Sequence, residues 1–140
     1  MELEEFLQNV ETRLVRAGQS IWKPNPKAAL RDEADRLSDE LGKRHEALAK
    51  IKSERGAAER RITENQNTIQ VLTSHIEACL SSGHGEPAWQ FALQLDRLRQ
   101  AIATDQATLP RIEQVCWSLQ FQIRQMERQL ARLHEKLFPT

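Results

Sequence analysis

The sequence has few aromatic residues and little of what fills an ordinary globular core. Aromatic residues make up 5% of the 140 residues, tyrosine is absent, and Ala, Glu, Gln, Arg, Lys and Leu dominate. Because so few bulky side chains are present, this composition predicts an all-α protein whose long helices meet along narrow seams.

Neither sign of charge is in excess, since Lys and Arg number 20 and Asp and Glu also number 20. No overall field attracts nucleic acid, and we expect no nucleic-acid partner. No apolar run approaches the roughly 18 residues that suggest a membrane-spanning helix. The N-terminus also lacks a basic region followed by an apolar run. We therefore expect a cytoplasmic chain with neither a membrane span nor a secretory signal.

Residues for metal or catalytic chemistry are sparse and scattered. The two cysteines, Cys79 and Cys116, lack metal-site spacing, which indicates reduced thiols in a cytosolic chain. Histidines stand singly at positions 45, 75, 84 and 134. Because no nucleophile, base and orienting group converge, we expect neither an enzyme nor a metal or cofactor site.

The first 23 residues predict a short amphipathic helix. Its apolar residues recur at steps of three and four: Leu3, Phe6, Leu7, Val10, Leu14, Ala17 and Ile21. The stretch "KPNPK" (Lys23–Lys27) then ends it, because proline cannot continue the hydrogen-bond ladder. Asn25 and Pro26 are typical of the N-cap and first residue of the next helix.

Residues 27–138 carry two long apolar seams with heptad spacing. The first runs through Leu30, Ala34, Leu37, Leu41, Arg44, Leu48, Ile51, Arg55, Ala58, Ile62, Asn65, Ile69, Leu72, Ile76 and Cys79. The second runs through Ala88, Phe91, Leu95, Leu98, Ile102, Asp105, Leu109, Ile112, Cys116, Leu119, Ile123, Met126, Leu130, Leu133 and Leu137. In both, steps of three and four alternate strictly, which predicts a coiled coil.

The stretch "SSGHGEPAW" between the seams predicts a turn. It lacks the preceding strand and the Lys before Ser or Thr of a phosphate-binding loop. Gly83, Gly85 and Pro87 instead favour a hairpin tip over residues 81–87. Folding the chain there pairs the seams antiparallel, and the residue numbers of every pair sum to 167.

Two helix-weakening residues lie almost level in this register. They are Gly56 in the first arm and Pro110, which should kink the second. Either they share a bend or close approach, or they are unrelated tolerated defects. A parallel dimer of very long helices is the alternative architecture, against which the shared register and the Gly–Pro tip argue.

Polar seam residues and spare aromatics raise the question of partners. Arg44, Arg55, Asn65 and Asp105 are read as register-specifying positions, with a polar partner site as the alternative. Arg61 or a neighbouring molecule could neutralise Asp105. Two i, i+4 pairs lie off the seam: Trp89 with Leu93, and Trp117 with Phe121. These four residues are the candidate partner-binding surface, unless residues 1–23 fold back over one pair.

The layout resembles the phage-shock protein A (PspA) and vesicle-inducing plastid protein family of the bacterial ESCRT-III superfamily. "NPKAALRDEADRLSDEL" (Asn25–Leu41) is similar to the segment after the family's hinge, and "EACLSSGHGEPAWQFAL" (Glu77–Leu93) to its tip. The resemblance covers nearly the whole chain and makes residues 24–26, with Pro26, the hinge.

The resemblance implies a non-enzymatic membrane-stress scaffold, peripheral on the inner membrane and forming homo-oligomers. It also implies a protein partner such as an AAA+ transcriptional activator. The membrane-binding residues would be Leu3, Phe6, Leu7, Val10, Leu14, Ile21 and Trp22. Two features depart from the family: residues 1–23 lack its basic face, and the chain ends at Thr140, as a fragment or a short relative would. The alternative function is a coiled-coil adaptor or oligomerisation module that never touches lipid.

Overall fold

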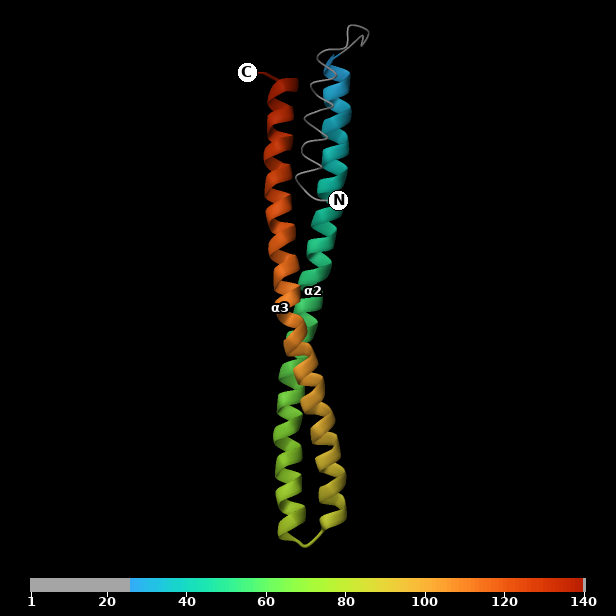
Figure 1. The fold of residues 1–140 in the computed structure, drawn as a ribbon, viewed down its shortest axis with the longest axis vertical. Helices are drawn as coiled ribbons and strands as arrows, with labels where there is room; N and C mark the ends of the chain where they lie inside the picture. The colour runs from blue at the N-terminus through green and yellow to red at the C-terminus, as the bar shows by residue number, and fades with distance from the viewer. Residues whose placement is uncertain (1–25, 140) are drawn as a thin grey trace. The chain divides into compact units, whose positions relative to one another are not determined.

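Two long helices make up nearly all of the part of the chain that the structure, a computed structural model, describes, residues 26–139. Helix α2 spans Pro26–Ser81 and helix α3 spans Gly85–Leu137, and no strand is found in this range. The helices pack against each other as a helical hairpin (Figure 1), which confirms the all-α prediction. The predicted amphipathic helix 1–23, with its membrane-binding residues, lies outside the described residues.

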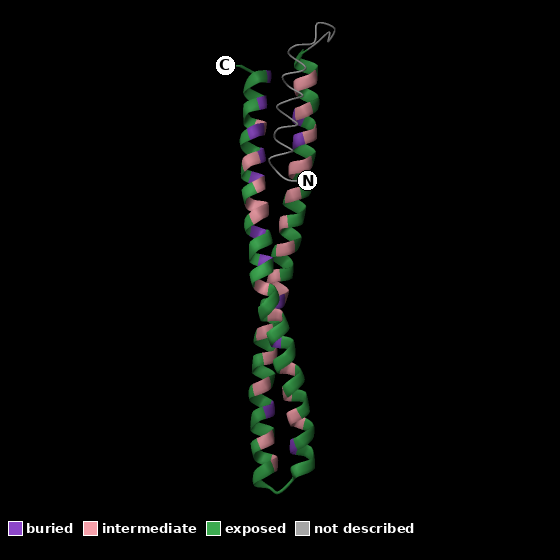
Figure 2. Ribbon diagram, viewed as in Figure 1, coloured by how far each residue is buried: buried purple, intermediate pink, exposed green. Residues whose placement is uncertain are grey.

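The two predicted seams are the buried faces of the helices. All 15 seam positions of α2 and all 15 of α3 are buried or half-buried, whereas most other positions are exposed (Figure 2). Since a two-helix coiled coil covers only its a and d positions, this pattern confirms the heptad assignment. Pro26 is the first residue of α2, as predicted. The N–H groups of a first helical turn have no acceptor within the helix, so the missing N–H of proline costs nothing there.

The hairpin tip is shorter than the predicted 81–87, because only residues 82–84 lie outside helices. Gly83 has a φ of 76°, where a side chain would be strained. The Gly83 N–H donates to the carbonyl of Leu80 and the His84 N–H to that of Cys79, which is the Schellman ending of a helix. Gly85 and Pro87 instead lie in the first turn of α3, where the first N–H groups have no helical acceptor and proline is tolerated.

The described residues divide into two compact units, one of residues 26–49 with 117–139 and one of residues 50–116. The first unit holds a continuous apolar cluster in which Leu37, Met126 and Leu133 are fully buried. Ala34 and Leu137 complete the cluster, and Leu30, Leu41 and Leu130 pack against it. This unit also buries the polar Gln129, one heptad position from the seam.

The second unit, residues 50–116, buries smaller side chains along its seam. They are Ala58, Leu72, Ala88, Ile102, Ile112 and Cys116. A Cβ built on Gly56 would meet only the far end of Arg60, at 3.4 Å, so the other helix does not approach closely there. The close-approach explanation of Gly56 is therefore wrong. Helix α3 continues through Pro110.

Candidate interaction surface

Three of the polar seam residues, Arg44, Arg55 and Asp105, have side-chain partners within the hairpin. Arg44 donates to the Gln122 side chain at 3.1 Å and forms an ion pair with Glu40 at 2.8 Å. The Arg44 and Lys43 hydrogen bonds hold the pKa of the Glu40 carboxyl below its ordinary value. These contacts favour a register-specifying role over a partner site.

The second unit contains two ion pairs between the helices. Arg55 contacts the Glu113 carboxylate at 3.2 Å. Both nitrogens of the Arg61 fork donate to Asp105, at 3.0 and 3.1 Å, so Arg61 is the residue that neutralises Asp105. This bidentate pair lowers the pKa of Asp105 and raises that of Arg61. Its geometry fixes the register at this level.

The described part of the chain was expected to lack a metal site, and its titratable side chains are scattered. Residues 26–139 contain no group of three or more His, Cys, Asp or Glu side chains that could hold a metal ion. Cys79 and Cys116 are free thiols. The described helices also contain no segment apolar enough to cross a bilayer.

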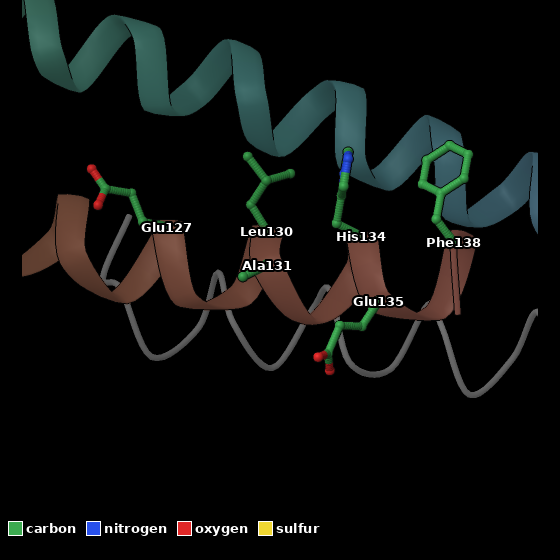
Figure 3. Close-up of a pocket in the computed structure, with 6 residues that line it drawn as sticks. All are labelled: Glu127, Leu130, Ala131, His134, Glu135 and Phe138. Carbon is green, nitrogen blue, oxygen red and sulfur yellow. The ribbon is translucent and has the colours of Figure 1, made fainter. Parts of the chain in front are cut away.

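An open apolar hollow of about 450 Å³ lies along α3 in the first unit. Its lining residues are Glu127, Leu130, Ala131, His134, Glu135 and Phe138. Leu130, His134 and Phe138 extend towards the side where α2 runs, whereas Glu135 points the other way (Figure 3). The His134 and Phe138 rings lie 5.2 Å apart. The sequence analysis missed this hollow, although the i, i+4 spacing of these side chains was a signal for it.

The spare aromatic residues are exposed, as the seam assignment predicted. Trp117 and Phe121 are 65% and 44% exposed, and their rings stack with centroids 5.9 Å apart. Trp89 and Leu93 are 62% and 40% exposed. Residues 26–139 therefore leave both pairs uncovered, and the predicted fold-back of residues 1–23 lies outside the described residues. Counting each seam as heptad positions a and d, both tryptophans stand at b, and Leu93 and Phe121 stand at f.

Each pair has charged neighbours at the same b and f positions, a feature that the sequence analysis missed. In the first unit, exposed Arg124 and Arg128 follow Phe121, and we call Trp117, Phe121, Arg124 and Arg128 the basic patch. In the second unit, exposed Glu86 and Asp96 flank the other pair, and we call Glu86, Trp89, Leu93 and Asp96 the acidic patch.

The charges of both patches are available to a partner. No ion pair between residues 26–139 involves any of the four charged residues. Asp96 accepts a hydrogen bond from Gln100, and Arg124 donates a long one of 3.4 Å to the Gln120 carbonyl. Reading charge together with heptad position, instead of apolar residues alone, would have identified both patches from the sequence.

Comparison with known proteins adds no relative. No protein-family model, no curated protein and no solved structure matches this chain. Each unit therefore has its own candidate site, the basic patch in the first unit and the acidic patch in the second, each centred on an exposed tryptophan.

Proposed function

We propose that this chain is a non-enzymatic helical-hairpin scaffold that acts through protein–protein contact. The observation that carries the proposal is the exposure of two pairs of large apolar side chains off the seam. Burying an exposed tryptophan against a partner contributes about 3 kcal/mol at roughly 25 cal/mol per Å². The hairpin does not bury these side chains, so we infer that a binding partner does.

The scaffold role is tested by photo-crosslinking in the native cell. Phe121 is replaced by benzoylphenylalanine in the full chain, and Thr63, an exposed polar position of α2, receives the same replacement as the matched control. We expect a discrete crosslinked protein species from position 121, weakened by Trp117→Ala, and none from position 63. If position 121 gives no more crosslinking than position 63, the proposal is wrong.

A membrane-associated, PspA-like stress scaffold is the second candidate function. The layout favours it, because the amphipathic pattern of residues 1–23 is followed by Pro26 and a helix of 56 residues. An AAA+ activator would be the protein partner that this resemblance implies. The balanced charge of residues 1–23 favours protein contact instead.

Co-sedimentation of the full chain with anionic and with neutral liposomes separates the two functions. Phe6→Asp with Val10→Asp disrupts the apolar face, whereas Gln8→Asp with Thr12→Asp adds the same charge to the polar face. A membrane role predicts pelleting that only the first pair of substitutions abolishes. An adaptor without a membrane role predicts that no variant pellets with lipid.

A further inference from the structure

The two patches of α3 carry opposite charges beside similar apolar pairs. The acidic patch surrounds Trp89 and Leu93 with Glu86 and Asp96, and the basic patch follows Trp117 and Phe121 with Arg124 and Arg128. The tryptophans are 28 residues apart, which is four heptads, so both pairs occupy the same positions of their repeats. A surface with this composition fits a second surface of opposite charge and similar apolar content.

An antiparallel alignment of two copies of α3 pairs these residues one by one. When the residue numbers sum to 210, Trp89 of one copy faces Phe121 of the other, and Leu93 faces Trp117. The same register places Glu86 opposite Arg124. Each tryptophan then meets a smaller apolar side chain, and a carboxylate meets a guanidinium at the edge of the contact.

Other pairings between copies fit less well. Joining two basic patches would bring Arg124 and Arg128 against the same arginines, and joining two acidic patches would oppose Glu86 and Asp96 to their own kind. A parallel alignment would set Trp89 against Trp117 and leave the smaller residues facing each other. It would also place the helix dipoles side by side in the same direction, which is less favourable than antiparallel.

We propose that the acidic patch of one copy of this chain binds the basic patch of a second copy, with the two α3 helices antiparallel. The inference rests on the proposed scaffold function and names the partner of that same surface. The exposed fractions of the four apolar residues, 40% to 65%, give the contact its area. The opposition of Glu86 and Arg124 at its edge sets the orientation.

Sedimentation velocity of the full chain over a range of concentrations tests the pairing by complementation. Trp89→Ala with Leu93→Ala removes the acidic patch, and Trp117→Ala with Phe121→Ala removes the basic one. We expect each variant to weaken association about tenfold or more, as loss of a central aromatic contact does. An equimolar mixture of the two variants should associate again, because one intact acidic patch then meets one intact basic patch.

Charge reversal tests the orientation. Glu86→Arg and Arg124→Glu should each weaken association, and the double variant should restore it, because the pair is rebuilt with its signs exchanged. Arg99→Glu, an exposed position off the b and f stripe, serves as the matched control and should change nothing. Circular dichroism of each variant verifies that the helices remain folded.

Two results would overturn the inference. One is association of both patch variants at the wild-type concentration, and the other is a mixture that stays as monomeric as its components. A third result would show that pairing between copies fails while the scaffold function holds. If the benzoylphenylalanine at position 121 captures another protein while the wild-type chain remains monomeric, the scaffold function stands and pairing between copies fails.

Discussion

Truncation of Leu133 should destabilise the first unit strongly, because this side chain is fully buried. Leu133 is 0% exposed and lies in the cluster with Leu37 and Met126. Leucine to alanine removes three carbon atoms, which costs about 2.4 kcal/mol at roughly 0.8 kcal/mol per buried methylene group. A residual cavity adds to this loss, and two helices can close around it only in part. We therefore expect Leu133→Ala to cost about 3 kcal/mol.

The matched control is Leu80→Ala, since Leu80 is 62% exposed. The same three carbon atoms are lost there from a largely hydrated position, and we expect a cost of about 1 kcal/mol or less. Urea unfolding monitored by circular dichroism gives both free energies, with the m-value showing whether the unfolding transition is unchanged. Equal costs for the two substitutions would refute the assignment of Leu133 to a sealed seam.

Three further predictions concern a helical glycine, an ion pair and the basic patch. Gly56→Ala should stabilise the hairpin by about 1 kcal/mol, because a Cβ there meets only the flexible end of Arg60. Thermal unfolding measures this gain, and a loss of stability would mean that the helices do approach there. Asp105→Asn should destabilise the chain most above the ordinary aspartate pKa, since Arg61 lowers the pKa of folded Asp105. The stability that the pair contributes is lost as pH falls through that lowered pKa. Plots of unfolding free energy against pH for wild type and variant should therefore meet at acid pH. Parallel plots would exclude the ion pair as the cause of the difference. Trp117→Ala should change unfolding free energy by less than about 1 kcal/mol, because an exposed side chain contributes little to folding; a larger loss in urea unfolding would show that Trp117 packs within the fold.

The hairpin could be predicted from the sequence because its seam obeys one simple period. Every apolar or polar seam residue from Leu30 to Leu137 is buried or half-buried, and the ion pair of Arg61 with Asp105 falls one residue from the predicted register. Two helices that bury only a and d positions leave a strong periodic signal. The choice of Arg61 as the partner of Asp105, instead of a neighbouring molecule, needed the side-chain geometry.

Other features depended on information that the period does not contain. The tip was predicted too long, because Gly85 and Pro87 are turn residues by composition yet are tolerated in a first helical turn. The burial of Gln129 was not expected at a position outside the seam. The charges around the aromatic pairs were missed because the apolar pattern alone was followed from Trp89 to Phe121.

Radical footprinting of Trp89 and Trp117 tests whether these exposed side chains are a protein-binding surface. Oxidation rates are compared between the full chain in dilute solution and the same chain in its native cell, with the exposed Leu80, which lies outside both patches, as internal reference. Both tryptophans should oxidise readily in dilute solution, because each is more than 60% exposed, and should become protected in the cell. Equal oxidation in dilute solution and in the cell would contradict a protein-binding role for the two tryptophans, because no partner would then cover them.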